Sequence, residues 1–91
     1  MMDKYAWQAA AYYSAKRIIA RKYRAKSFLA EELLVDVVKD IGETMDFRTF
    51  GGTIRSLSND GFIQRIGYAA AKSSNGSAKP VWIKVPHWGK K

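Results

Sequence analysis

The spacing of hydrophobic residues along the chain changes from a helical period to a strand period. Residues 3–59 repeat their apolar positions every three or four residues, in three segments separated by polar or glycine-containing breaks. Residues 62–68 and 81–85 alternate apolar with polar or small side chains. A period near 3.6 predicts amphipathic helices, and a period of two predicts strands. The pattern therefore predicts three helices followed by two strands, an α+β fold.

The first predicted helix covers about residues 3–24, with Asp3 as its N-cap and neither proline nor glycine inside it. Its cationic side includes Arg17 and Arg21. Its apolar arc is wider than one core stripe requires. The arc consists of Tyr5, Trp7, Ala11, Tyr12, Ala15, Ile18, Ile19 and Tyr23. Either one flank of this arc joins two copies into a homodimer, or the domain uses the whole arc internally.

The second predicted helix covers about residues 29–39, with Ser27 as a candidate N-cap and Gly42 at its end. Its inward positions are Leu33, Leu34, Val37, Val38 and Ile41. Its outer side is acidic and consists of Glu31, Glu32, Asp36 and Asp40. An acidic helix surface of this kind favours an alternative function, that of a protein-interaction module that binds and modulates a host or phage protein.

The third predicted helix covers about residues 47–59, between an Asp46 cap and the stop signal at residues 59–61. Its predicted inward stripe is Phe47, Phe50, Ile54 and Leu57, with Gly51 and Ser58 beside it. The opposite side is predicted to show Arg48, Thr49, Gly52, Arg55, Ser56 and Asn59.

The two predicted strands enclose a polar loop at residues 69–79, whose sequence is AAAKSSNGSAK. Trp82 and Tyr68 are expected to pack under this hairpin. Three helices followed by a long hairpin is the order of a winged helix, in which the loop is the wing. We expect one domain over residues 1–91, with the winged-helix unit at 27–85 and a frayed tail at 86–91.

Several short motifs carry a family resemblance, and together they span residues 27–85. They are Arg48-Thr49-Phe50-Gly51, Gly61-Phe62-Ile63, Gly67-Tyr68, and the return from Gly76 to Pro80-Val81-Trp82. In these motifs the chain resembles the small winged helix-turn-helix proteins often encoded by phages and prophages. The resemblance implies a role in DNA binding, as a regulator of transcription or an accessory protein.

In a helix-turn-helix protein, the third helix enters the major groove of duplex DNA. Arg48 is then the candidate for bidentate contact with guanine. Arg55 is expected to meet phosphate, and Gly52 to allow close approach to the groove. The other expected contacts are Thr49, Thr53 and Ser56 on the helix, Lys72, Ser74, Asn75 and Lys79 on the wing, and Arg17 and Arg21 on the first helix. The competing interpretations are a solvated helix face and an ordinary hairpin loop.

Charge supports a polyanionic partner. The net charge is +8, divided as +6 in residues 1–26, −4 in residues 27–60 and +6 in residues 61–91. The chain has no cysteine, and its single histidine, His87, has no carboxylate near it in sequence. We therefore expect no enzyme activity, no metal and no cofactor. Without a long apolar run or a signal-peptide pattern, we expect a cytoplasmic protein with no membrane contact.

Overall fold

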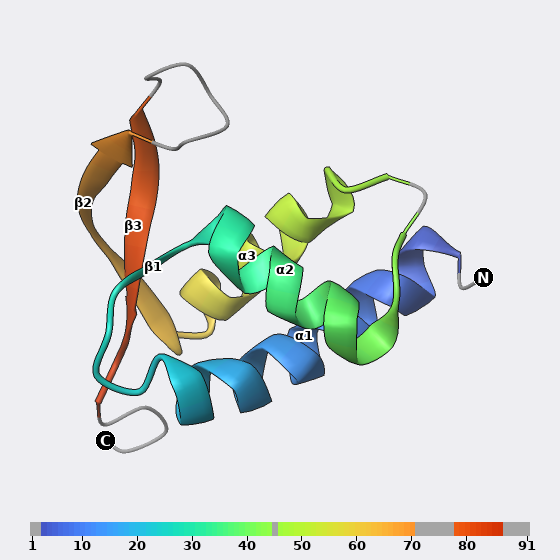
Figure 1. The fold of residues 1–91 in the computed structure, drawn as a ribbon, viewed down its shortest axis with the longest axis horizontal. Helices are drawn as coiled ribbons and strands as arrows, with labels where there is room; N and C mark the ends of the chain where they lie inside the picture. Colours follow the sequence, from blue (N-terminus) through green and yellow to red (C-terminus); the bar gives the residue numbers. More distant parts are fainter. Residues whose placement is uncertain (1–2, 45, 71–77, 87–91) are drawn as a thin grey trace.

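The computed structural model describes residues 3–44, 46–70 and 78–86. Three helices pack on one side of an antiparallel hairpin, as Figure 1 shows. The elements are α1 (Lys4–Lys22), β1 (Phe28–Leu29), α2 (Ala30–Ile41), α3 (Thr49–Asn59), β2 (Ile63–Ala70) and β3 (Ala78–Lys84). This order has the topology of a winged helix, so the predicted α+β class and architecture are confirmed.

The helix ends follow from local hydrogen bonds. Asp3 Oδ1 accepts from the backbone N–H of Tyr5 and Ala6 at 2.9 and 2.8 Å, which confirms the first cap. The cap predicted at Ser27 is wrong, because α2 begins after Leu29, whose N–H donates to Glu32 Oε1 at 2.8 Å. An acidic side chain in the first turn thus takes up an N–H that the helix leaves unpaired.

The second and third helices end at glycine-containing turns, as predicted. Gly42 is the C-cap of α2, and its φ of 91° lies in the left-handed region that favours glycine. After α3 the chain turns at Gly61, with φ 81°, and Phe62 N–H donates to Leu57 O. α3 itself begins at Thr49, two residues later than predicted, since residues 47–48 form a turn.

The sheet has the strand order β1-β3-β2, and both pairs are antiparallel. β1 pairs Phe28 with Trp82, and its two residues are too few to leave a period in the sequence. β2 and β3 extend into the predicted loop, because Ala70 pairs with Ala78. The wing was predicted at residues 69–79, and its part at 71–77 lies outside the described residues.

The core lies where the three helices meet the sheet. Its buried hydrophobic residues are Trp7, Ala11, Ala15, Ile19, Tyr23, Phe28, Leu33, Val37, Phe50, Ile54, Leu57, Phe62 and Ile63. Trp7 is fully buried and donates its indole N–H to Gly42 O at 2.9 Å, which ties α1 to the end of α2. Most of the apolar arc of α1 is therefore used within the domain. Tyr5, at 73% exposed, is its clear exception, and the homodimer stays a prediction.

Two aromatic residues lie elsewhere than predicted. Phe47 is 46% exposed instead of buried, because it precedes the first turn of α3 and does not share the stripe of Phe50. Tyr68 is exposed on β2, with the Arg65 guanidinium 5.3 Å from its ring centroid. Trp82 packs partly buried against the core, as expected. None of the helices among the described residues has the length and apolarity that crossing a membrane requires.

Candidate nucleic-acid interface

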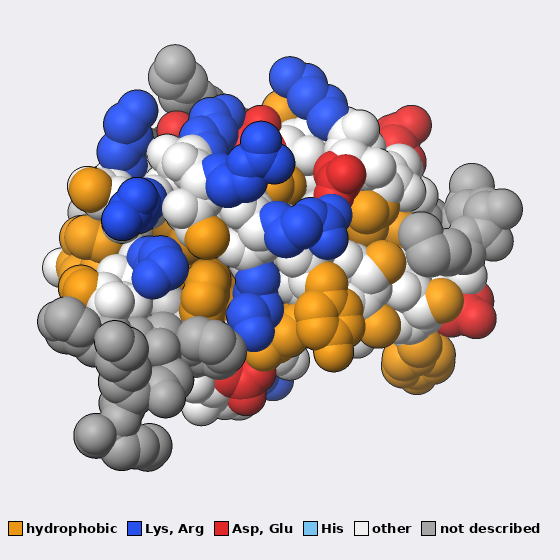
Figure 2. Space-filling view, turned by 90° about the horizontal axis from the view of Figure 1, so that it is seen from below, with side chains coloured by type: hydrophobic (Ala, Val, Ile, Leu, Met, Phe, Trp, Pro, Cys, Tyr) orange, Lys and Arg blue, Asp and Glu red, His pale blue; other side chains and the backbone are white. Residues whose placement is uncertain are grey.

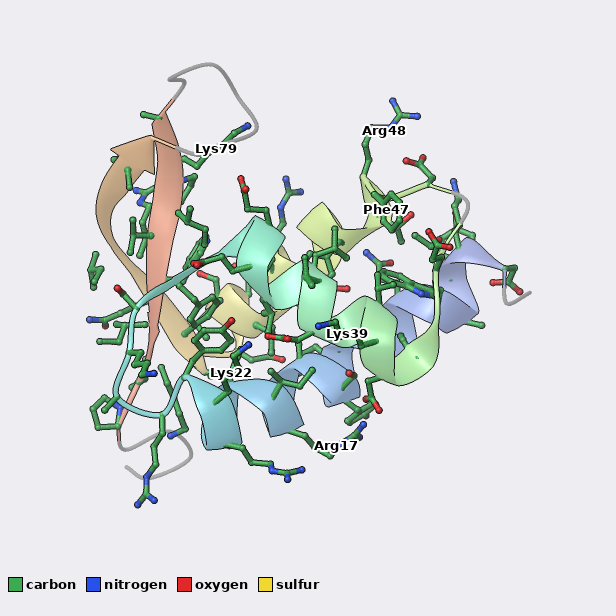
Figure 3. All side chains as sticks on the ribbon, in the orientation of Figure 1. Arg17, Lys22, Lys39, Phe47, Arg48 and Lys79 are labelled. Atoms are coloured by element: carbon green, nitrogen blue, oxygen red, sulfur yellow. The ribbon has the colours of Figure 1, made fainter. Side chains whose placement is uncertain are left out.

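One side of α3 is open to solvent, and its exposed positions begin at the N-terminal end of the helix. Phe50, Thr53, Ile54 and Leu57 are the buried residues of α3. Arg48, Gly51 and Arg55 are exposed, and their spacing of three and four residues places them along one stripe. Figure 3 shows Arg48 projecting from the upper side of the molecule.

Arg48 is held by a neighbouring carboxylate. Its backbone N–H and its Nε both donate to Asp46 Oδ1 at 3.0 Å, and its Nη2 donates to Asp46 Oδ2 at 3.2 Å. The hydrogen bonds from Arg48 lower the pKa of the Asp46 carboxyl, and the same carboxylate raises the pKa of Arg48. The Arg48 side chain is 91% exposed, so it can exchange this partner for another anion. Asp46 thus both orients Arg48 and competes with any ligand for it.

The hairpin brings a third cation to the same side of the fold. Lys79 is exposed on β3, and Figure 3 shows it on the upper side, as Arg48 is. It lines a groove of about 440 Å³ between α2, α3 and the hairpin. The other lining residues are Leu29, Ala30, Glu31, Leu34, Phe47, Phe50, Gly51, Ile54, Pro80 and Trp82. We call Arg48, Gly51, Arg55 and Lys79 the α3–hairpin face.

Two residues predicted to contact DNA are instead turned toward α1. Thr53 is 1% exposed, and its Oγ1 donates to Gln8 O at 3.4 Å, so its predicted DNA contact is wrong for this conformation. At Gly52, an added Cβ would lie 1.9 Å from Gln8 Nε2. The absence of a side chain there lets α1 approach α3, whereas Gly51 is the open position, where an added Cβ would meet nothing within 4 Å. The prediction had these two glycines reversed.

Thr49 and Ser56, the remaining α3 residues predicted to contact DNA, are neither fully buried against α1 nor part of the α3–hairpin face. Thr49 is half-buried, and its carbonyl accepts from Gln8 Nε2 at 3.0 Å. Ser56 is exposed but borders a hollow shared with Tyr5 and Tyr13 of α1. Both therefore lie toward α1, beside the α3–hairpin face. The predicted wing contacts Lys72, Ser74 and Asn75 lie outside the described residues.

Arg17 and Arg21, the two α1 cations predicted to contact DNA, lie elsewhere. Arg17 and Arg21 line a groove between α1 and α2, and Figure 3 shows Arg17 leaving the lower side of the molecule, away from Arg48 and Lys79. Figure 2, which looks at the molecule from below, shows Lys and Arg side chains gathered over this side. Arg17 and Arg21 therefore do not extend the α3–hairpin face, contrary to the expectation from sequence.

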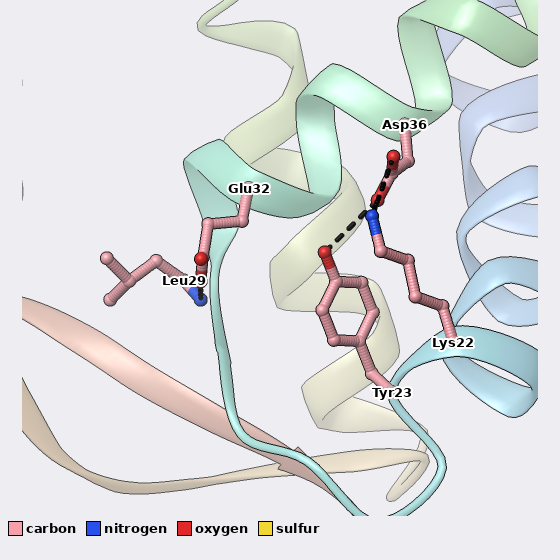
Figure 4. A network of polar contacts seen from close by, with 5 residues as sticks. All are labelled: Lys22, Tyr23, Leu29, Glu32 and Asp36. Carbon is pink, nitrogen blue, oxygen red and sulfur yellow. Dashed lines mark hydrogen bonds and ion pairs between the residues drawn. The ribbon is translucent and has the colours of Figure 1, made fainter.

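The acidic side of α2 is largely used within the fold. Asp40 accepts from Ser14 at 2.7 Å and from Arg17 at 2.5 Å. Asp36 accepts from Lys22 Nζ at 2.9 Å and from the Tyr23 hydroxyl at 3.1 Å. Figure 4 shows the three side chains pointing toward one another. Glu32, in the same view, accepts from Leu29 N–H. The acids meet α1 because the basic side of that helix packs beside them, and this reduces the acidic surface available to a partner.

The described residues contain no group of three or more His, Asp or Glu side chains arranged to hold a metal ion. Comparison of the chain with protein-family models, curated proteins and solved structures gave no match.

Proposed function

We propose that this protein binds duplex DNA through the α3–hairpin face. The observation that carries the proposal is that Gly51 of the exposed α3 stripe and Lys79 of β3 line one groove in a winged-helix topology. Arg48 and Arg55 are the exposed cations on either side of Gly51 along that stripe. In such folds the third helix reaches base edges from its N-terminal end while flanking cations meet the backbone. The resemblance to phage-type winged helix-turn-helix proteins supports the same role, in regulation of transcription or as an accessory protein.

The position of each residue on the α3–hairpin face determines whether it suits contact with a base or with a phosphate. Arg48 lies at the start of α3 and can offer two parallel N–H donors to guanine O6 and N7 once it leaves Asp46. Arg55 lies two turns further along, and Lys79 comes from the hairpin, so both suit phosphate. Gly51 adds no side chain between them, which lets the helix backbone come close to the groove edge.

A salt titration on duplex DNA tests this assignment. Each lost phosphate contact should reduce the steepness of log K against log salt by about 0.9. We therefore expect Arg55→Ala and Lys79→Ala each to flatten the slope by about that amount, for any DNA sequence. Lys26→Ala is the matched control, because Lys26 is an exposed cation in the connection after α1 and should leave the slope unchanged.

Arg48→Ala should behave differently from the phosphate variants. It should weaken binding to a selected site and relax the preference at one base pair, by about 1–3 kcal/mol. Binding that is absent at low salt, or equal losses for the control and the three face variants, would contradict the proposal.

A second candidate function is protein docking, and the groove beside α3 favours it. The groove combines a half-exposed Phe47 with Trp82, Pro80 and Leu34, which is an apolar lining suited to a partner side chain. Phe47→Ser separates the two functions. It should leave DNA binding nearly unchanged if phosphates and bases are the ligand, and should abolish capture of a partner that inserts an apolar side chain.

A further inference from the structure

The groove between α1 and α2 collects cations from two helices. It has a volume of about 600 Å³. Its lining residues are Arg17, Ile18, Arg21, Lys22, Asp36, Lys39 and Asp40, and we call this surface the α1–α2 groove. Four of the seven are cationic and two are acidic, which leaves a net charge of +2.

The two acids of the groove form ion pairs with two of its cations, and both cations stay exposed to solvent. Arg17 pairs with Asp40, and Lys22 pairs with Asp36, yet the Arg17 and Lys22 side chains remain 59% and 58% exposed. Arg17 Nη2 donates to Asp40 Oδ2, and the other N–H groups of the guanidinium remain available to a ligand. The ion pairs therefore fix these two side chains at the rim of the groove.

The other two cations carry the excess charge. Arg21 and Lys39 are exposed, and neither has an acidic partner among the described residues. They come from different helices and lie across one groove, so together they can face a row of negative charges.

This groove does not belong to the α3–hairpin face. In Figure 3, Arg17 leaves the lower side of the fold, while Arg48 and Lys79 mark the upper side. The principal extents of the molecule are 36 × 36 × 21 Å. A duplex of about 12 base pairs is about 41 Å long, at 3.4 Å per base pair. A short straight duplex on one side therefore leaves the other side open.

We propose that the α1–α2 groove is a second polyanion site, which takes the phosphate backbone of a second DNA duplex, so that one molecule bridges two DNA segments. The proposal rests on DNA binding by the α3–hairpin face. The groove supplies charge without a protruding recognition helix, so its contact is independent of sequence and depends strongly on salt.

Two variants with the same charge change test the bridge. Arg21→Gln with Lys39→Gln removes two cations from the α1–α2 groove, and Arg55→Gln with Lys79→Gln removes two from the α3–hairpin face. Each lowers the net charge from +8 to +6, by subtraction of two. Binding is measured with excess duplex of about 12 base pairs, by sedimentation velocity at low salt. Bridging is measured by capture of a labelled duplex on an immobilised one.

We expect the native protein to bind two duplexes and to capture the labelled one. The Arg21/Lys39 variant should bind one duplex and lose capture at least tenfold, with its selected-site affinity retained. The Arg55/Lys79 variant should lose capture too, but through weaker binding at the first site. Circular dichroism melting of each variant separates these losses from unfolding.

The contrary results are distinct. One duplex per native molecule at saturation, without capture, overturns the bridge and leaves the proposed function standing. A second result also overturns the bridge. If the native protein binds one duplex and both variants weaken that binding equally, one duplex contacts both sides of the molecule. If the native protein binds no duplex at low salt, the proposed function and the bridge both fail.

Discussion

The adjacent glycines of α3 give a sharp test of how this helix is oriented. Gly51 faces open space, whereas a Cβ at Gly52 would lie 1.9 Å from the Gln8 amide nitrogen. In an exposed helical position, replacement of glycine by alanine stabilises a protein by roughly 0.5–1 kcal/mol. Gly51→Ala should therefore raise the free energy of unfolding by that amount. For a domain of this size, the melting temperature should rise by about 2–8 °C.

Gly52→Ala should lack most of this gain. The new methyl group displaces the Gln8 side chain, whose Nε2 donates to Thr49 O at 3.0 Å. Loss of that hydrogen bond costs about 0.5–1.5 kcal/mol, which offsets the helix-propensity gain. The two variants change the same residue type one position apart in the same helix, so their difference isolates the contact with α1.

A double-mutant cycle completes the test. In a Gln8→Ala background the three atoms nearest to the new methyl group are removed, so Gly52→Ala should stabilise the protein about as much as Gly51→Ala. Chemical denaturation followed by tryptophan fluorescence provides the four free energies. If Gly51→Ala destabilises the protein while Gly52→Ala stabilises it, α3 presents the opposite side to α1 and the α3–hairpin face is wrongly assigned.

Three further perturbations follow from the core and the polar contacts. Leu57→Ala removes a fully buried side chain and should cost about 2–5 kcal/mol in denaturant unfolding, and a cost below about 1 kcal/mol would mean that the site is not closed. The pKa of Asp40 is lowered by hydrogen bonding from Ser14 and by Arg17, so its contribution to stability is present above about pH 3.8 and is lost as the pH falls through and below that value. Asp40→Asn should flatten the stability curve in that acid range, and an unchanged curve would contradict the role of this pair. Hydrogen bonding to Asp60 raises the pKa of Tyr12 from 10.0 to about 12. The contribution of this hydrogen bond to folding stability is therefore present below pH 10 and is lost between pH 10 and 12. Tyr12→Phe should remove the highest-pH step from an ultraviolet titration of tyrosine ionisation, and persistence of that step would assign it to another tyrosine.

Periodic features of the chain were sufficient to predict the order of elements. The apolar stripes place Phe50, Ile54 and Leu57 in the core, and Asp3 and Gly42 mark helix ends. These features are local, since capping and amphipathicity depend on residues within one or two turns. The winged-helix architecture follows from their order, which is why sequence alone predicted it.

Contacts between elements decided the existence of β1 and which side of α3 is buried. β1 exists only because Phe28 and Leu29 pair with a strand more than fifty residues later, a relation that no local pattern carries. α3 begins at Thr49, so Phe47 falls outside its inward stripe, and α1 covers the side that holds Gly52 and Thr53.

The charges show the same division. The sequence determined that basic segments flank an acidic one, and the distribution favours a polyanionic partner. Only the tertiary structure decided which charges meet, because Asp36 and Asp40 lie against Lys22 and Arg17 once α1 and α2 pack together. That packing removes much of the acidic surface predicted on α2, and Arg17 and Arg21 lie away from Arg48. Side chains on different helices become neighbours through folding, so the number of charges was readable from the chain and their grouping into two faces was not.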